Sequence, residues 1–319
     1  EIDMNEGVLD VIELKFPPKG TLVTPNFGKA TGLRFFPLLR SLGIFAGLLA
    51  KATDGRMPAD HETIRVWGVH GGTIGDDFFL FREVLGGGGP GRPWADGSDV
   101  VHVVPNSRNL PAEFSETRYP VIIEKLGLAA DSGGSGYRRG GLGYDKRVKV
   151  LTECEALSNA DRALMNTYGV NGGKYGGTYG VEIEYADGEK RGLAGMEDRV
   201  PVTAGSTIKI RTTGGGGWGD PLSREAEMVC LDVQSGLVSK EAACEDYGVV
   251  LDREGRRYVV DQAATNKLRN AIRAKRGRLP MFDRGPYFAD MKHKVERPQG
   301  WDDPDEGWFA ADVVAEAAE

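Results

Sequence analysis

Short runs of alternating hydrophobic and polar residues recur over most of the chain, and this pattern is typical of β-strands that bury one face. The clearest runs lie at residues 64–69, 78–81, 121–124, 148–151, 181–185 and 206–211. Two further runs, at residues 8–14 and 100–104, predict additional strands. Asp187 and Gly188 follow one of the clear runs and predict a hairpin turn. The sequence therefore predicts a β-rich region between about residues 64 and 215.

Helices are predicted at three places outside this region. Residues 33–52 are rich in Leu, Phe and Ala, and their apolar stretch at residues 44–50 is too short to cross a bilayer, which takes about 20 residues. We therefore interpret this stretch as a buried helix segment. Ser239 is placed to cap a short helix over residues 240–246, and residues 261–275 predict a longer basic helix.

Glycine is concentrated in two ordered blocks, residues 131–143 and residues 214–219, the second of which is followed by Asp-Pro. Glycine is favoured where the backbone needs a positive φ or where another group must approach closely. The blocks are therefore either tight turns between β elements, which we favour, or places where a substrate or a partner backbone comes close. Neither block, nor the glycine run at residues 86–91, has the spacing of a phosphate-binding loop, so we do not expect this chain to bind a nucleotide directly.

Short strands joined by glycine-rich loops and followed by helices predict an α+β fold, with a β-rich core and a helical C-terminal segment. We divide the chain into this core at residues 1–221, a helical segment at residues 222–280 and an acidic arm at residues 281–319. The arm holds two tryptophans among many acids. It packs either on a partner or on its own domain, and the sequence favours neither.

The bulk composition, with 40% hydrophobic and 27% charged residues, is that of a soluble globular protein. A formal net charge of -7 opposes binding to the phosphates of nucleic acids. The three cysteines lack CxxC spacing, which predicts reduced thiols in a cytoplasmic protein. We therefore expect neither nucleic acid nor a membrane among the partners.

Two of the four histidines are catalytic candidates. His70 lies beside two glycines at the end of a predicted strand, and His102 lies in an apolar run just before Asn106. Imidazole titrates near neutral pH and can transfer protons there, although a neutral core histidine with one hydrogen bond is the alternative for each. No histidine pair has the spacing of a zinc site, so we expect no metal in this chain.

A dense polar segment follows His102. Its amides, Asn106 and Asn109, are candidates for binding substrate, and its carboxylates, Glu113 and Glu116, are candidates for acid–base catalysis or for orienting a partner. Polar groups at this density must be hydrogen-bonded if they are buried. A structural network that fixes the β core is the favoured alternative.

Arg138 and Arg139 lie inside the first glycine block. A guanidinium binds carboxylate or phosphate through two parallel hydrogen bonds, so these arginines are candidates for contacting an anionic substrate or intermediate. The favoured alternative is that they pair with Asp131 and Asp145 across the loop.

The glycine blocks and the polar segment together resemble the hydantoinase B/5-oxoprolinase family over about residues 60–255. Members carry a DSGG-G-x-RGG-G segment and, later, a GGGG-aromatic-GDP segment, and both match the glycine blocks in order and spacing. The family's N-T-x-N-T-P-x-E segment matches residues 106–113, but Ser107 and Leu110 replace the usual threonines. That replacement weakens any role assigned to those hydroxyls.

The resemblance implies that this chain corresponds to the second half of the family's B-type polypeptide. Such a polypeptide works with an A-type subunit that holds ATP with Mg, and the family's metal-binding histidines lie in the first half. We therefore expect three partners: an A-type subunit, a chain that carries the first half, and a small carbonyl substrate. ATP, Mg and any further divalent metal are then held outside this chain.

The same resemblance implies that ATP phosphorylates a carbonyl or enolate oxygen. The activated species is hydrolysed in enzymes that open cyclic amides, such as N-methylhydantoinase and 5-oxoprolinase, and is carboxylated in acetone and acetophenone carboxylases. We expect ATP-dependent opening of a cyclic amide, with ketone carboxylation as the alternative. A third possibility is a non-catalytic scaffold that docks the catalytic partners, which the acidic tryptophan-bearing arm and the lack of metal spacing favour.

Overall fold

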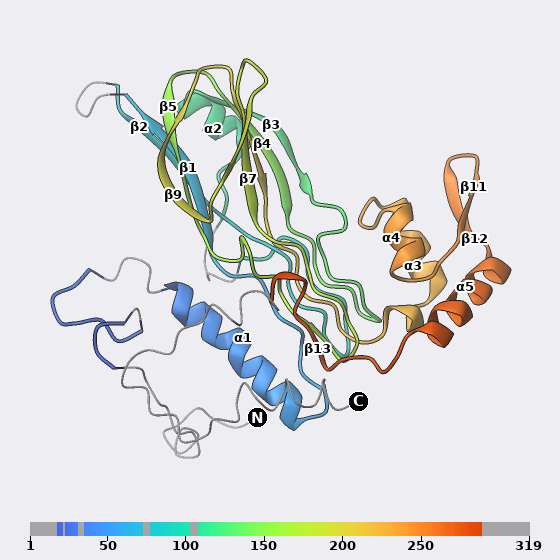
Figure 1. The fold of residues 1–319 in the computed structure, drawn as a ribbon. Coiled ribbons are helices and arrows are strands. Elements are labelled where there is room, and N and C mark those ends of the chain that lie inside the picture. The colour runs from blue at the N-terminus through green and yellow to red at the C-terminus, as the bar shows by residue number, and fades with distance from the viewer. Residues whose placement is uncertain (1–17, 22, 31–34, 73–76, 103–107, 289–319) are drawn as a thin grey trace.

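The computed structural model describes residues 18–21, 23–30, 35–72, 77–102 and 108–288, and it has an α+β fold (Figure 1). Two antiparallel sheets form its upper part. The first has the order β2-β1-β5-β9, with strands Phe79–Leu85, Arg65–Gly71, Cys154–Ala160 and Met196–Val202. The second has the order β3-β4-β10-β7-β8, with strands Val121–Leu128, Tyr144–Val150, Thr207–Arg211, Gly180–Glu184 and Lys190–Leu193.

The two sheets share one hydrophobic core. Trp67 and Phe81 from the first sheet pack in one cluster with Val148, Ile183 and Ile208 from the second. Burial alternates residue by residue along β5, as expected for a strand with one face in the core. All six strands predicted from the clear runs are confirmed, and the hairpin predicted at Gly188 joins β7 to β8.

Below the sheets, six mostly irregular segments run side by side without forming strands of either sheet, and two of them, residues 131–143 and 166–177, include a turn (Figure 1). We call them the glycine bundle: residues 59–62, 86–91, 96–99, 131–143, 166–177 and 212–219. Most of these segments continue directly from a strand. Residues 59–62 precede β1, residues 86–91 follow β2, and residues 212–219 follow β10. Because these strands are antiparallel, the segments all leave the sheets at the same end.

Hydrogen bonds in the glycine bundle extend in several directions around a segment. A strand in a sheet has at most two hydrogen-bonded neighbours. Residues 212–219, in contrast, bond to four other segments. Their amides donate to the carbonyls of Asp60, Gly141 and Lys174, at 2.8 to 3.0 Å, and their carbonyls accept from the amides of Gly91 and Gly134, each at 2.8 Å.

Close backbone packing explains the glycines of this bundle. A Cβ atom added at Gly88 would lie 1.9 Å from the carbonyl oxygen of Gly141, and one added at Gly216 would lie 1.9 Å from that of Tyr168. Of the glycines in the bundle, only Gly172 and Gly219 have a positive φ. The favoured interpretation as tight turns is therefore wrong, because the glycines let backbones of this same chain touch.

The strand predicted at residues 100–104 is also wrong in its described part. Val100 has a φ of 46°, and its amide donates to the carbonyl of Leu142 at 2.8 Å. Val101 makes only an isolated bridge with Gly87. The described part of this apolar run therefore continues directly from the bundle segment at residues 96–99 and does not form a strand. The strand predicted at residues 8–14 lies outside the described residues, as do residues 289–319 of the arm.

The first helix, α1 (Phe35–Ala52), confirms the prediction for residues 33–52 and lies along the glycine bundle (Figure 1). The interpretation of residues 44–50 as a buried segment is wrong, because Ile44 is 58% and Leu49 is 44% exposed. Among the described residues, α1 is the one helix that is long and apolar enough to cross a membrane by length and composition, with a mean hydropathy of 1.4.

A helical segment with its own core lies beside the bundle. It contains η2 (Pro221–Ser223), α3 (Ala226–Gln234), α4 (Lys240–Glu245), the hairpin β11 (Leu251–Glu254) and β12 (Arg257–Val260), and α5 (Gln262–Lys275). The predicted helices α4 and α5 are confirmed, and the Ser239 hydroxyl caps α4 as expected. Helix α3 was not predicted, because no side chain caps its N-terminus. The remaining elements are α2 (Ala112–Arg118) and the short pair β6 (Gly169–Val170) and β13 (Phe282–Asp283).

Candidate functional site

Two of the predicted site residues, His102 and Asn109, form a hydrogen-bonded pair where the first sheet passes into the glycine bundle. The Nε2 atom of His102 lies 2.9 Å from Oδ1 of Asn109, and Nδ2 of Asn109 donates to the carbonyl of Val84 at 3.0 Å. Because Nδ2 is used as a donor, Oδ1 is the acceptor that faces the imidazole. The neutral His102 ring then carries its hydrogen on Nε2, which leaves Nδ1 as an acceptor.

Tyr144 extends this cluster, since its hydroxyl lies 3.4 Å from Oδ1 of Asn109. Burial raises the pKa of Tyr144, and the negative charge of Glu83 raises it further. The hydroxyl therefore stays protonated at neutral pH and donates to the amide. Asn109 thus joins a histidine, a tyrosine and the end of β2, and it holds the imidazole in one tautomer.

The two carboxylates predicted for acid–base catalysis lie outside the pair formed by His102 and Asn109. Glu113 and Glu116 lie exposed on α2, and Oε1 of Glu116 accepts a hydrogen bond from the amide of Ile123 at 2.8 Å. That contact anchors the start of β3 to α2. Within the described chain, no hydrogen bond connects either carboxylate to His102. Asn106 lies outside the described residues.

His70 lies far from His102. It is the penultimate residue of β1, a quarter of its side chain is exposed, and its Nε2 lies 3.6 Å from a carboxylate oxygen of Glu155. His102 reaches Val84 through Asn109, and Val84 pairs with Val66 near the start of β1. About four residues of strand, or roughly 13 Å, separate the two places. The two histidines therefore cannot act in one site.

The predicted pairing of Arg138 and Arg139 with Asp131 and Asp145 is wrong. The Nη1 atom of Arg139 lies 3.2 Å from Oδ1 of Asp99, because the bundle brings residues 96–99 beside residues 139–141. Asp145 pairs with Lys125, and Asp131 accepts from the amide of Ser239. Arg139 is only 4% exposed, so it has little surface with which to meet a substrate. The guanidinium of Arg138 lies 4.8 Å from the ring centre of Tyr137.

A second arginine network ties the helical segment to the bundle. Arg224 donates two hydrogen bonds to the carboxylate of Asp96, both at 2.8 Å, and a third to Asp232 at 2.8 Å. Asp96 also accepts from the amide of Arg139 at 2.9 Å. A bidentate arginine–carboxylate pair of this kind is strong and directional. It fixes the start of α3 against residues 96–99.

Acidification is expected to weaken this attachment. Burial alone would raise the pKa of Asp96, but Arg224 and the amide of Arg139 outweigh it and hold the pKa below its ordinary value of 3.8. The contribution to stability is therefore present above pH 3.8 and is lost as the pH falls through the lower folded-state value. The free energy of unfolding in urea should fall more between pH 6 and about pH 3 for the unmodified chain than for Asp96→Asn, by up to about 1 kcal/mol. Equal losses in both proteins would contradict this role.

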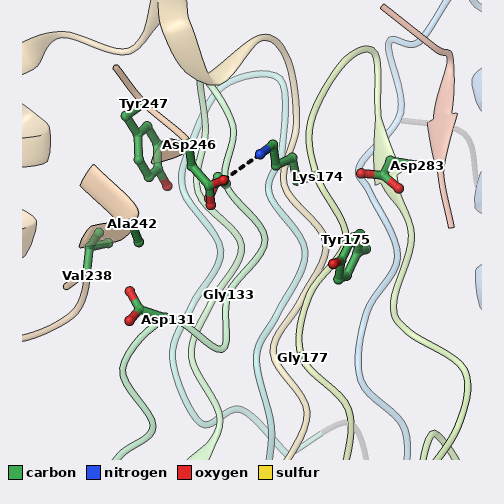
Figure 2. Close-up of a pocket in the computed structure, with 11 residues that line it drawn as sticks. Asp131, Gly133, Lys174, Tyr175, Gly177, Val238, Ala242, Asp246, Tyr247 and Asp283 are labelled. Atoms are coloured by element: carbon green, nitrogen blue, oxygen red, sulfur yellow. Dashed lines mark hydrogen bonds and ion pairs between the residues drawn. The ribbon is translucent and has the colours of Figure 1, made fainter. Parts of the chain in front are cut away.

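A cavity of about 330 Å³ lies where the glycine bundle meets α4 (Figure 2). Gly133 and Gly177 line it with backbone, and Lys174 points across it to an ion pair with Asp246. Ser135 donates to the other oxygen of Asp246 at 2.6 Å. Sequence reasoning assigned no role to Lys174 or Asp246. The available signal was that Lys174 is the one charged residue in the glycine-rich stretch at residues 171–177.

The charges around this cavity limit what it can bind. Asp131, Asp246 and Asp283 line it against one ammonium group, that of Lys174. The excess of negative charge disfavours phosphates and favours a neutral or cationic ligand that donates hydrogen bonds. The Lys174 ammonium is already paired, so it is poorly placed to act as a base.

Metal and thiol chemistry have little support in the described part of the chain. No group of three or more His, Cys, Asp or Glu side chains is arranged there to hold a metal ion. Burial raises the pKa of the Cys154 thiol to about 12, and the neighbouring glutamates add to this effect. A thiol of that kind is not nucleophilic at neutral pH.

The amino-acid sequence is similar to those of a known protein family. A sequence model of the family described as hydantoinase B/oxoprolinase matches residues 1–221. Protein MJ0963 of Methanocaldococcus jannaschii, which is uncharacterized, is 34% identical over 84% of this chain and 47% of its own length. The putative B-type subunit of a D-/L-hydantoinase from a Pseudomonas species is 30% identical over 83% of this chain and 44% of its own. The beta subunit of the caprolactamase of Pseudomonas jessenii is 35% identical over 50% of this chain and 28% of its own.

Solved structures have the same fold. The nucleotide-free acetone carboxylase superposes with a TM-score of 0.66 and 19% identity, over 87% of this chain and 42% of that one. The ATP-dependent caprolactamase of Pseudomonas jessenii superposes with a TM-score of 0.59 and 24% identity, over 84% of this chain and 48% of that one. The chain thus spans less than half the length of each of these relatives.

Proposed function

The chain belongs to the hydantoinase B/oxoprolinase family, and from that premise we propose that it is part of the B-type subunit of an ATP-dependent enzyme that opens a cyclic amide. The names of its relatives carry this proposal. The hydantoinase and caprolactamase subunits and a plant 5-oxoprolinase, the last 29% identical over 69% of this chain, all have names that refer to cyclic amides.

In the proposed reaction a partner subunit holds ATP with Mg, which supplies the phosphoryl group that activates the ring carbonyl. This chain contributes proton transfer and positioning. Nδ1 of His102 is an acceptor that has no hydrogen-bond partner among the described residues, and Asn109 holds the ring in that tautomer. In this tautomer Nδ1 can take a proton from an attacking water.

Replacing His102 with asparagine is expected to lower turnover by roughly 100-fold, because it removes the proton acceptor. Assembly and thermal unfolding should be unchanged. The matched control is His70→Asn, which removes an imidazole of similar accessibility at the far end of β1. Steady-state kinetics of the assembled complex would check this. Equal rates in both variants would rule out His102 as the base.

The proposed function is tested on the purified complex. Native mass spectrometry should find this 34.5 kDa chain with an A-type subunit and a chain that carries the first half of the B-type polypeptide. ATP hydrolysis by that complex should then depend on an added lactam, hydantoin or 5-oxoproline. Incorporation of labelled bicarbonate into a ketone would instead identify a carboxylase. A stable assembly with neither activity would identify a scaffold.

A further inference from the structure

Helix α1 has apolar residues around most of its axis, yet the described residues bury only one side of it. The covered side consists of Leu39, Gly43 and Ala50, all of which are buried. Seven other large apolar side chains of the helix are exposed: Phe35, Leu38, Leu42, Ile44, Phe45, Leu48 and Leu49. A helix that is apolar all round is normally buried on every side. The outer side of α1 is therefore a surface that the described residues leave exposed.

The exposed residues form a continuous surface. Leu38, Leu42, Phe45 and Leu49 follow one another at intervals of four, three and four residues, so they line one face of the helix. We call these four residues the apolar stripe. An 18-residue helix is about 27 Å long and about 10 Å across, so half its surface is on the order of 400 Å². A patch of that size is as large as the largest apolar patch of a typical soluble monomer, and such patches are often functional.

The attachments of α1 argue against a membrane as the environment of the stripe. Arg40 donates to Asp161 at 3.0 Å, and the hydroxyl of Tyr168 donates to the carbonyl of Gly43. Ala50, near the other end of the helix, is fully buried. These contacts hold α1 lengthwise against the glycine bundle. A helix that spans a bilayer could not keep them, because lipid would surround it.

We propose that the apolar stripe docks onto the polypeptide that carries the first half of the B-type fold. The helix lies inside the region that matches the family, residues 1–221, so it belongs to the shared fold. This chain covers only 47% and 44% of two of its relatives, which therefore contain further polypeptide able to cover the same face. The inference rests on the proposed function, since it needs that second chain to exist.

The test uses the full chain co-expressed with the first-half polypeptide and the A-type subunit. The double substitution Leu42→Glu/Leu49→Glu places two charges in the centre of the proposed interface, where they would be desolvated. It should weaken binding of the first-half polypeptide at least 100-fold by native mass spectrometry. The matched control, Leu126→Glu/Leu231→Glu, changes leucines that are 57% and 56% exposed elsewhere and should bind normally. Unchanged circular dichroism and thermal unfolding would show that both variants fold.

A photo-crosslinking residue at Phe45 gives a second readout that does not depend on charge. It should couple to the first-half polypeptide. Coupling to a second copy of this chain, to residues 289–319 of the same chain, or to phosphatidylcholine vesicles would overturn the proposal, as would a complex that survives the double substitution. Those results leave the proposed function standing if the complex still turns over a cyclic amide. Failure of the unmodified chains to assemble would overturn both.

Discussion

Replacing Gly215 with alanine is expected to prevent this chain from folding to a stable structure. The new Cβ atom would lie 1.9 Å from the carbonyl oxygen of Gly89, so the neighbouring segment would have to move by about 1.5 Å to restore van der Waals contact. That segment cannot move alone, because Gly89 also bonds to Ser98 and Gly141. We expect a loss of at least about 4 kcal/mol, which is a large part of the stability of an ordinary domain. Urea unfolding and the soluble yield would measure it.

Glycines outside the bundle supply the matched control. Gly180 and Gly192 lie in strands β7 and β8, neither has a positive φ, and no atom lies within 4 Å of a Cβ added at either. Alanine there should be neutral or stabilise the fold by up to about 1 kcal/mol, because it restricts the unfolded chain. If Gly215→Ala behaved like these two, the close packing of the bundle would be refuted.

Removing the ammonium group of Lys146 is expected to destabilise the chain by about 3–5 kcal/mol, because it leaves Glu83 charged and buried without a partner. The two side chains are 4% and 2% exposed, and Nζ lies 2.6 Å from Oε2 of Glu83 between the two sheets. The ammonium also lies 5.9 Å and 5.8 Å from the ring centres of Trp67 and Phe81. Lys146→Met keeps much of the volume, so urea unfolding would report the loss of charge rather than of packing.

A double substitution distinguishes the destabilisation caused by one unpaired buried charge from the stability that the ion pair itself contributes. Glu83→Leu/Lys146→Met removes both charges and should recover most of the lost stability, since buried pairs can often be replaced by apolar residues. The Oε1 atom of Glu83 has no hydrogen-bond partner among the described residues, which strengthens this expectation. Breaking the exposed pair Arg191–Glu197 should cost no more than about 1 kcal/mol. A double variant as unstable as Lys146→Met would contradict this account.

The strands were predictable because each of them buries one face in a core that the chain itself supplies. The run at residues 181–185 corresponds to β7, in which Val181 and Ile183 face the core. The glycine blocks could be recognised in the sequence, but their packing against one another could not be predicted. The amide of Gly134 bonds to the carbonyl of Gly215, 81 residues further on, and no local pattern encodes that contact.

In the candidate site too, contacts between residues close in sequence could be predicted and contacts between distant residues could not. His102 and Asn109 are seven residues apart, so their proximity could be expected from the polar segment that joins them. Arg139 pairs with Asp99, 40 residues earlier, because the bundle brings those segments together. The cavity beside Lys174 combines side chains from the bundle and the helical segment, and no single stretch of sequence contains them.

The order in which the bundle segments occur along the chain has a consequence for biosynthesis. Residues 212–219 lie at the centre of the hydrogen-bond pattern, yet they are the last of the six segments to be translated. Contacts between residues far apart in sequence form slowly, and the earlier segments lack their central partner until the ribosome has passed residue 219. Nascent chains shorter than this expose unpaired glycine backbone. We therefore expect this protein to fold late and as one unit, and to need a chaperone while it is still being made.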